Sequence, residues 1–262
     1  IDQGNQVKID DKIEIRGNIK TKNKIIEREI SDKLITDKVF SLSEIEKSAQ
    51  RIRDLGVFDN VRPDTQPILG TDNVYKLIMD VKERNSKSIN VNAGFSSSEG
   101  FRGGIEASHI SLWGTARKIS GKAQFGTQGQ RFESEYVEPK IFGTSAFGIV
   151  NIYPYSEYIE KGYKEIRKGL SAGISWRLRR INMVKLDYRY DVLEYNLDKK
   201  MEVTKIGRIE TTLQRDSRNN VLNPEKGAYY GLSLEYANPK LGGFETFTKL
   251  YLNNMYYHKL FN

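Results

Sequence analysis

The segment Val74–Gly104, VYKLIMDVKERNSKSINVNAGFSSSEGFRGG, decides the fold because two different sequence patterns meet in it. Before it, the pattern predicts two capped amphipathic helices and short strands. After it come segments of roughly ten residues with an apolar residue at every second position, which is typical of strands that face lipid on one side and water on the other. The sequence therefore predicts a small α+β domain joined, almost without a linker, to an antiparallel transmembrane β-barrel.

Composition sets looser bounds. The chain has 262 residues, which is room for two domains. Hydrophobic residues are 38%, charged residues are 29% and mean hydropathy is −0.59, and no segment approaches the ~20 apolar residues of a spanning helix. Barrel strands need apolar residues on one face only, and the 15 Tyr and 11 Phe suit interfacial aromatic girdles. An ordinary soluble β-sandwich fits the same composition.

Other functional classes are disfavoured by the residues present. The chain has no cysteine, so it has no disulfide framework and no thiolate metal site. Its net charge of +8 is spread along the chain among 34 acidic residues, so we expect no nucleic-acid partner. His109 and His258 have no sequence neighbours that would make either a metal ligand or a general base, and GFSSSEGFRGG lies between strands rather than before a helix. We expect no enzyme, no metal and no cofactor.

The N-terminal part predicts a strand, two helices and two further strands. Lys12–Arg16 reads as the first strand. A helix is predicted from a cap at Thr21 to about Leu34, with its apolar residues on one face. Ser43 and Glu46 predict a capping box for the second helix, which Gly56 ends. Alternation then predicts strands at Val57–Arg62 and Val74–Lys82.

This region resembles a POTRA domain, the periplasmic polypeptide-transport module. The resemblance rests on IEIRGN, IIEREI, RIRDLGVFDNV and VYKLIMDVKERN, which follow one another in that order. It places the POTRA domain at residues 12–86 and makes residues 1–11 the end of a preceding POTRA repeat or a linker. Residues 87–262 are then the N-terminal portion of the barrel. Because the chain begins at Ile1 without Met, we expect a mature form or a fragment.

Alternation is clearest in three segments of the second part, and about ten strands are expected there. The apolar members of these segments are Leu170, Ala172, Ile174, Trp176 and Leu178; Val184, Leu186, Tyr188, Tyr190 and Val192; and Tyr230, Leu232, Leu234 and Tyr236. The residues between them include Lys, Asp, Arg and Glu. Burying unpaired ions of this kind in a soluble core would cost several kcal/mol each. A water-filled barrel interior removes that cost, and so does a one-sided sheet with its polar face in solvent.

These strands resemble the BamA/TamA-type outer-membrane barrel family, and the join of POTRA to first strand is closest to BamA. The resemblance rests on VKERNSKSINVNAGFSSSEG, HISLWGTARKISGKAQFG, FESEYVEPKIFG and LQRDSRNNVLNPEKGAYYGLSLEY. The last segment matches a family turn motif at Asp216, Arg218, Asn219, Asn220, Pro224 and Gly227. We expect Pro224 and Gly227 to shape the turn, and Asp216 and Arg218 to fix it by hydrogen bonds rather than to bind substrate.

Two departures from the family bear on the extent of the barrel. The family barrel has sixteen strands, and its inward-folded Val/Ile-Arg-Gly-Phe/Tyr loop motif does not occur after the tenth expected strand here. Either the sequence is a fragment of a longer protein, which we favour, or a short barrel closes as a homodimer with a second copy. An open sheet edge cannot remain unpaired in lipid, since each exposed backbone group there costs several kcal/mol.

The resemblance implies an outer-membrane protein assembly factor with its POTRA domain in the periplasm. Its partners would be unfolded outer-membrane protein clients, outer-membrane lipid and accessory periplasmic lipoproteins. The first barrel strand, Ile89–Ser98, would form one side of a lateral gate, with Ile89, Val91, Ala93 and Phe95 facing lipid and Asn90, Asn92 and Gly94 polar or small. The alternative is a type V-like secretion pore for a dedicated passenger or partner protein. A passive porin is disfavoured because porins do not carry POTRA domains.

Overall fold

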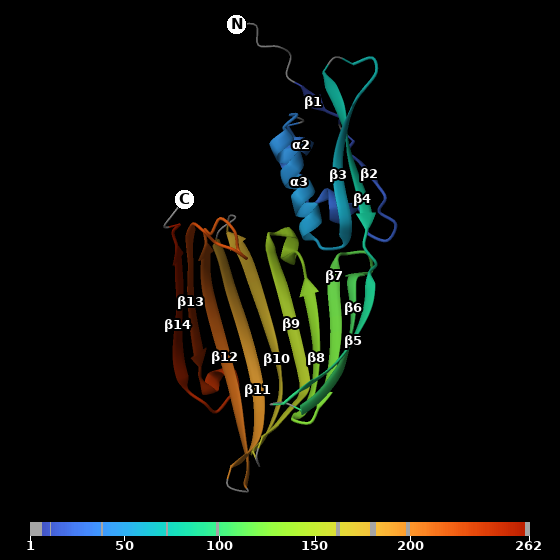
Figure 1. Ribbon diagram of the computed structural model, residues 1–262. Helices are drawn as coiled ribbons and strands as arrows, with labels where there is room; N and C mark the ends of the chain where they lie inside the picture. The colour runs from blue at the N-terminus through green and yellow to red at the C-terminus, as the bar shows by residue number, and fades with distance from the viewer. Residues whose placement is uncertain are drawn as a thin grey trace. The chain divides into compact units, whose positions relative to one another are not determined.

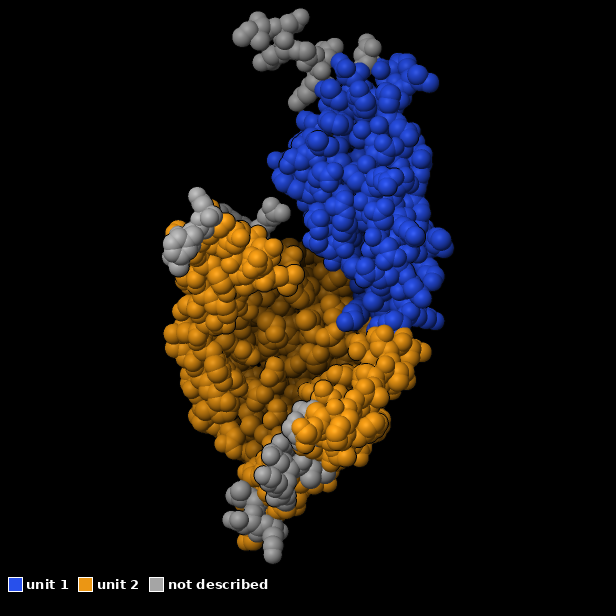
Figure 2. Space-filling model, viewed as in Figure 1, with its two compact units in different colours: residues 1–88, 108–118 blue, residues 89–107, 119–262 orange. Residues whose placement is uncertain are grey.

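The computed structural model describes residues 7–10, 12–37, 39–71, 73–97, 100–160, 163–178, 182–197 and 200–259. It divides into two compact units, residues 1–88 with 108–118 and residues 89–107 with 119–262 (Figure 2). Residues 1–6 and 11 of the predicted preceding repeat, and Ser98 of the predicted gate strand, lie outside the described residues.

Unit 1 contains a four-stranded sheet organised around β4 (Val74–Glu83). β1 (Lys8–Ile9) and β2 (Glu14–Arg16) pair with it in parallel along one side, and β3 (Phe58–Pro67) pairs antiparallel along the other. Alternate residues of β4 and β3 enter one apolar core with the helices, namely Leu77, Met79, Val81, Phe58 and Val61. The α+β architecture expected for this part of the chain is therefore present.

The helical layer consists of α1 (Asn23–Glu27), α2 (Asp32–Ile35) and α3 (Leu42–Asp54) (Figure 1). The prediction of one helix from Thr21 to Leu34 is wrong, because the helical backbone is interrupted before α2. At Ser31 the backbone is extended, with a ψ of 133°. The Ser31 N–H donates to Ser48 Oγ at 3.0 Å instead of to a helical carbonyl. The two short helices still contribute Ile25, Ile26 and Leu34 to the core.

The start of α3 also differs from the prediction. The cap is Ser41, whose Oγ accepts the Glu44 N–H at 3.4 Å, so the predicted pair of Ser43 and Glu46 is wrong by two residues. The sequence SLSEIE contains two overlapping Ser-x-x-Glu patterns, and a contact from α2 favours the first of them. Ser31 Oγ donates to the Glu44 carboxylate at 2.9 Å. The predicted end of this helix at Gly56 is confirmed, since Gly56 follows the last turn of α3 and has a φ of 71°.

β3 extends five residues beyond the predicted end at Arg62. It continues through Pro63 to Pro67, both paired with β4. A proline in a strand is tolerated where its missing N–H would point away from the ladder, which is the case along a sheet edge. The two prolines therefore mark β3 as an edge strand.

The loop after β2 is fastened to two other parts of unit 1. The Glu83 carboxylate accepts the backbone N–H groups of Lys20, at 3.0 Å, and Thr21, at 2.6 Å. Partial burial alone would raise the pKa of Glu83, but these backbone hydrogen bonds outweigh it and the net pKa is lowered. The Lys22 N–H donates to Gly114 O at 3.0 Å, and Ala116 is buried in the apolar core, so the turn formed by residues 113–116 belongs to unit 1.

Unit 2 is built from one ten-stranded sheet whose strands follow chain order from β5 at one edge to β14 at the other (Figure 1). The predicted fold class is confirmed. The strands are β5 (Lys87–Ser96), β6 (Gly100–Leu112), β7 (Arg117–Gly126), β8 (Gly129–Glu138), β9 (Ala146–Glu160), β10 (Tyr163–Leu178), β11 (Asn182–Leu197), β12 (Lys200–Asp216), β13 (Gly227–Ala237) and β14 (Phe247–Tyr257), with short 3-10 helices η1 (Ile141–Gly143) and η2 (Pro239–Leu241). In the described ranges, no helix is long and apolar enough to cross a membrane.

Replacing Glu83 by Gln is expected to loosen the loop after β2 by about 1 kcal/mol, a value reduced for partial exposure. Because folding lowers the Glu83 pKa, the carboxylate's contribution is complete above the ordinary glutamate pKa of about 4.3 and is lost as pH falls through the folded value. Hydrogen exchange of peptides covering residues 17–24 should therefore be faster in Glu83→Gln at pH 7, with a smaller difference in acid. Glu46→Gln, on the exposed face of α3, is the matched control, and equal exchange in both variants would contradict this role.

Candidate functional site

One face of the unit 2 sheet is apolar and exposed. Antiparallel pairing places the side chains of facing residues on the same side, and the pairs Leu170–Ile152, Leu213–Leu232 and Leu234–Leu250 belong to one such face. Each of these six side chains is exposed, and so are others on the same face, namely Val150, Leu186, Tyr230 and Leu252. We call this side of the sheet the apolar face.

The opposite side, the polar face, holds buried polar residues. Ser171, Ser175, Asp187 and Asp191 are all at most 8% exposed. They face polar or small residues across the strands, as in the pairs Ser175–Lys185 and Asp187–Glu210. The surface of unit 2 is hollowed in Figure 2, where the inner wall of the sheet is visible.

This distribution is the reverse of that in a water-soluble sheet. Exposing one large aliphatic side chain to water rather than burying it costs about 1.5–3 kcal/mol, so the apolar face would cost on the order of 20 kcal/mol in water. Lipid removes this cost, and a wet interior accommodates the ions of the polar face. Neither the soluble β-sandwich nor the one-sided solvated sheet fits this arrangement of the described residues.

A charged cluster lies at the centre of the polar face. Asp191, 1% exposed, accepts a 2.5 Å hydrogen bond from the Tyr153 hydroxyl at Oδ1. Its Oδ2 lies 2.6 Å from Nη2 of Arg208, whose Nε lies 3.1 Å from Glu235 Oε1. One guanidinium therefore bridges two carboxylates from neighbouring strands, which ties β9, β11, β12 and β13 together through side chains as well as through the backbone ladder.

Glycines on β10 make room for these carboxylates. A Cβ at Gly169 would lie 2.9 Å from Asp191 Oδ1 and 2.8 Å from the Tyr153 ring, and a Cβ at Gly173 would overlap the Asp187 carboxylate. Any larger residue at either position would push the acids out of the cluster. The glycines are thus part of the polar face and not merely flexible positions.

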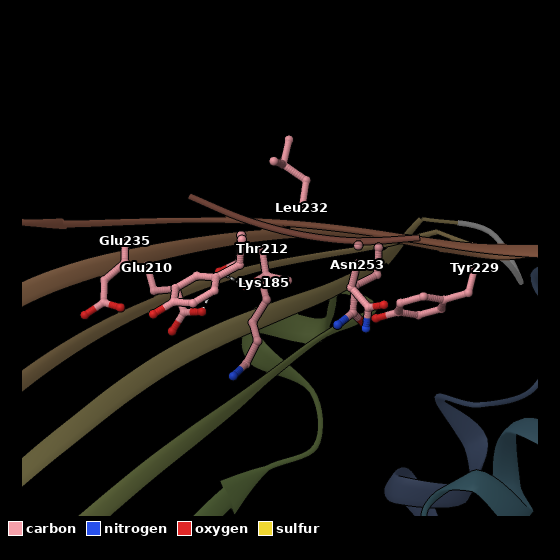
Figure 3. Close-up of a pocket in the computed structure, with 11 residues that line it drawn as sticks. Lys185, Glu210, Thr212, Tyr229, Leu232, Glu235 and Asn253 are labelled. Carbon is pink, nitrogen blue, oxygen red and sulfur yellow. Dashed lines mark hydrogen bonds between the residues drawn. The ribbon is translucent and has the colours of Figure 1, made fainter. Parts of the chain in front are cut away.

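Beside this cluster the polar face forms an open groove of about 510 Å³ (Figure 3). Figure 3 shows Lys185, Glu210, Tyr229 and Asn253 on one side of the sheet and Leu232 on the other. Within the groove, Ser233 Oγ donates to Glu210 Oε1 at 2.5 Å. Both signs of charge and several hydroxyls line it, so it suits water and extended polypeptide better than one small ligand.

The predicted gate residues Ile89 to Phe95 lie on β5, at one edge of the described sheet. All ten residues of β5 are exposed, including Ile89, Val91 and Phe95. The topology places β6 beside β5 on one side, while β5 and β14 are the two edges of the described sheet. The Ser88 and Ser108 hydroxyls bond to each other between β5 and β6 at 2.8 Å. Asn90, Asn92, Ala93 and Gly94 complete the strand, and Ser98 lies outside the described residues.

The predicted turn motif joins β12 to β13 and bonds to itself. Asp216 accepts from the Arg218 backbone N–H at 3.1 Å and from its guanidinium Nε and Nη2 at 2.9 and 2.6 Å. Asn219 Oδ1 accepts the N–H groups of Glu225 and Lys226, both at 3.0 Å. These bonds occupy the polar groups of the motif within the turn.

Three further motif residues complete this turn. Asn220 Oδ1 accepts the Leu222 N–H at 2.8 Å. Pro224 follows, and Gly227 opens β13 with a φ of 103°. A Cβ at Gly227 would overlap the Ser217 carbonyl, so the close approach of the two chain segments requires glycine.

The cluster around Asp191 was not predicted as a site from the sequence. Asp187, Arg189 and Asp191 stand out as the polar members of an alternating strand, but the partners of Asp191, which are Tyr153 and Arg208, come from strands elsewhere in the sequence. Only the strand register, such as Arg189 opposite Arg208, brings them together. Ionisable residues at the same parity on adjacent expected strands are the signal that could have pointed to it.

Replacing Arg208 by Met is expected to destabilise the sheet by about 3 kcal/mol, because it leaves the buried Asp191 carboxylate and Glu235 without their shared cation. Adding Asp191→Asn to Arg208→Met should restore part of the loss. Denaturant unfolding in lipid vesicles measures both changes. Arg177→Gln, an exposed arginine on β10, is the control, and an Arg208→Met loss no larger than that of the control would contradict the bridging role.

Two family signatures match the chain. The Omp85 superfamily domain matches residues 112–262, which is more than half of the sequence. The POTRA signature, described as a surface antigen variable number repeat, matches residues 8–84.

Individual relatives agree with these signatures. The outer membrane protein assembly factor BamA of Neorickettsia risticii (strain Illinois) is 30% identical over 171 residues, which are 64% of this chain and 22% of that protein. BamA of Neisseria meningitidis serogroup B (strain ATCC BAA-335 / MC58) is 29% identical over 123 residues, 47% of this chain and 15% of that protein. The chain thus spans only a minor part of the length of either relative.

Solved structures share the fold. The crystal structure of BamA from Haemophilus ducreyi lacking POTRA domains 1-3 has a TM-score of 0.75 at 17% identity, covering 95% of this chain and 51% of that one. CdiB from Escherichia coli has a TM-score of 0.60 at 13% identity, with 93% of this chain and 47% of that one covered. The ten-stranded sheet therefore corresponds to part of a larger barrel in these structures.

Proposed function

Because the chain belongs to the Omp85 superfamily and is of the BamA/TamA type, we propose that it is part of an outer-membrane protein assembly factor. In this proposal unit 1 is a periplasmic POTRA domain that receives unfolded β-barrel clients. The unit 2 sheet lies in the outer membrane, and β5 forms one side of a lateral gate through which client strands enter the lipid. Residues 12–86 are the POTRA domain and residues 87–262 the N-terminal portion of the barrel.

The exposed edge of β5 carries the proposal. A strand edge in lipid presents unpaired N–H and C=O groups, each of which costs several kcal/mol unless another strand pairs with it. The side chains on both faces of β5 are exposed, so they do not pack against other side chains that would hold a permanent partner strand in place. Asn90, Asn92 and Gly94 supply small or polar side chains that weaken pairing. A partner strand at this edge can therefore be exchanged for a client strand, with hydrogen bonds traded rather than lost.

The POTRA sheet offers the client one suitable edge. Along β3, Pro63 and Pro67 lack the N–H groups that an added strand would need, and Asp59, Arg62 and Asp64 add charge, so this edge is protected. The β2 edge, on the other side of β4, has no proline within Glu14–Arg16. We propose that an incoming client strand adds here by β-augmentation.

No chemical step or cofactor is required. The client supplies the free energy, because its apolar side chains move from water into lipid and its backbone groups become paired as it folds. The polar face and its groove would form the wet interior behind the gate. Accessory periplasmic lipoproteins, as partners of unit 1, belong to the same proposal.

The second candidate is a type V-like secretion pore. The likeness to CdiB concerns the fold alone and does not favour it over insertion. In a secretion pore the passenger would move along the polar face, and the β5 edge would stay paired throughout transport. A short barrel closed by a second copy would likewise keep β5 permanently paired. Exchange at the β5 edge therefore separates insertion from both of these alternatives.

A proline scan of the gate strand tests the proposal. In an edge strand, successive residues point their N–H groups alternately at the neighbouring strand and at the free edge. We expect Asn90→Pro, Val91→Pro, Asn92→Pro and Ala93→Pro to alternate in effect. Substitutions at free-edge positions should leave the barrel folded but reduce client insertion about tenfold, while those facing β6 should weaken the barrel itself. The measured quantity is the rate at which a urea-denatured client folds into vesicles that contain the full-length protein.

Asn90→Ala, Val91→Ala and Asn92→Ala are the matched controls, because alanine shortens the side chain and keeps the N–H, and the unsubstituted protein serves as the control for Ala93→Pro. Those variants should insert clients at nearly the unsubstituted rate. If free-edge prolines leave insertion unchanged in a folded barrel, the gate assignment is wrong. If they impair export of a passenger but not insertion, the secretion pore is the better description.

A further inference from the structure

Two large apolar side chains of unit 1 are exposed near a place where two chain segments meet. Trp113, in the turn between β6 and β7, is 69% exposed, and Ile19, in the loop after β2, is 88% exposed. Neither contributes to the apolar core of unit 1. Exposing residues of this size to water is unfavourable, and an indole in a tight turn is an uncommon choice for a solvated loop.

Backbone contacts hold these two segments together. The Lys22 N–H donates to Gly114 O at 3.0 Å, and a Cβ at Gly114 would overlap the Lys20 carbonyl. Gly114 has a φ of 71°, and its neighbour Trp113 also has a positive φ of 53°. A β turn that forces a tryptophan into this conformation is costly for a bulky residue, so the placement of Trp113 is specific.

Basic side chains surround the same place. Lys20, Lys22 and Lys24 are all exposed, and none of them forms a salt bridge with another described residue. The carboxylate of Glu83, at the end of β4, accepts the backbone N–H groups of Lys20 and Thr21. The loop and the start of α1 therefore present three exposed ammonium groups, and Ile19 next to Lys20 is exposed as well.

Membership of a membrane-barrel family leads us to expect this turn near the membrane surface. It directly connects β6 to β7, and both strands carry exposed apolar side chains, among them Phe101, Ile105, Ile119 and Phe125. A turn between two lipid-facing strands must emerge where hydrocarbon gives way to headgroups, and Trp and Lys are the residues that favour this boundary. The backbone contacts bring the Ile19–Lys22 loop to the same level.

We propose that Ile19 and Trp113 insert into the headgroup region of the adjoining leaflet, where Lys20, Lys22 and Lys24 bind lipid phosphates. We call this group of five residues the lipid anchor. Through it, unit 1 binds an anionic membrane surface directly, in addition to being covalently linked to the sheet. The inference rests on membership of a membrane-barrel family and on the contacts above, and it does not depend on whether the protein inserts or secretes polypeptide.

Fluorescence of Trp113 tests the lipid anchor. The sequence has two tryptophans, so Trp176→Phe leaves Trp113 as the sole emitter in this chain. The chain is placed in vesicles of phosphatidylcholine and phosphatidylglycerol that contain lipids brominated high on the acyl chain. We expect Trp113 to be quenched by the brominated lipid and protected from acrylamide in water. Protection should increase with the phosphatidylglycerol fraction.

A matched control places an indole elsewhere in unit 1. Leu69, at the tip of the β3–β4 hairpin, is 99% exposed and has no lysine next to it in the sequence. With Trp113→Phe and Trp176→Phe in the same chain, Leu69→Trp should respond to acrylamide and not to brominated lipid. Combining Lys20→Gln, Lys22→Gln and Lys24→Gln should abolish the dependence of Trp113 on phosphatidylglycerol.

Three results would overturn the proposal. Trp113 could be as open to acrylamide as the indole introduced by Leu69→Trp. Its quenching by brominated lipid could be the same with and without the three lysines. Finally, Trp113 could be shielded only when an unfolded client is added, which would make this surface a polypeptide site. Native migration on gels checks that each variant is folded.

Discussion

The structure depends on one constraint, that a β-sheet with an exposed apolar face must lie in lipid and must have its backbone groups paired there. The alternation along β9 to β14 puts Leu and Val on one face and Asp, Ser and Arg on the other. Only a membrane on the first side and water on the second satisfy both sets of side chains. The same constraint applies at the edges of the described sheet, β5 and β14, whose backbone groups need a pairing partner in lipid. A protein that controls what pairs with such an edge can use it to accept a strand from another protein.

The polar face shows how side-chain interactions link strands of the sheet to one another. Arg208 bridges Asp191 and Glu235, and Tyr153 donates to Asp191. These polar side chains link the strands β9, β11, β12 and β13, which do not include β5. Gly169 and Gly173 make the space for those acids. The turn from Asp216 to Gly227 closes the β12–β13 hairpin with its own hydrogen bonds. At the β5 edge, the Ser88 and Ser108 hydroxyls bond to each other between β5 and β6. The proposed function places strand exchange at this edge and not at the strands that the Asp191 cluster links.

Much of the fold could be predicted because each strand carries its period-two pattern locally, and because the order of POTRA segments is distinctive. The predictions that are wrong fail because contacts between different elements override the local sequence pattern. The first helix breaks at Ser31 because Ser48, on α3, accepts its N–H, and the cap of α3 moves to Ser41 because Ser31 binds Glu44. β3 runs through two prolines because it lies at an edge. The Asp191 cluster could not be derived from the sequence, since a shift of one residue in any strand pairing would separate its members.

The most direct test of this account is the accessibility of two adjacent residues of β13, Leu232 on the apolar face and Ser233 on the polar face. The chain has no cysteine, so Leu232→Cys and Ser233→Cys can each carry a single nitroxide label in vesicles. The account predicts that the label at 232 is relaxed mainly by oxygen dissolved in lipid, and the label at 233 mainly by a water-soluble nickel complex. Equal access of the nickel complex to both labels, or the reverse order, would contradict it.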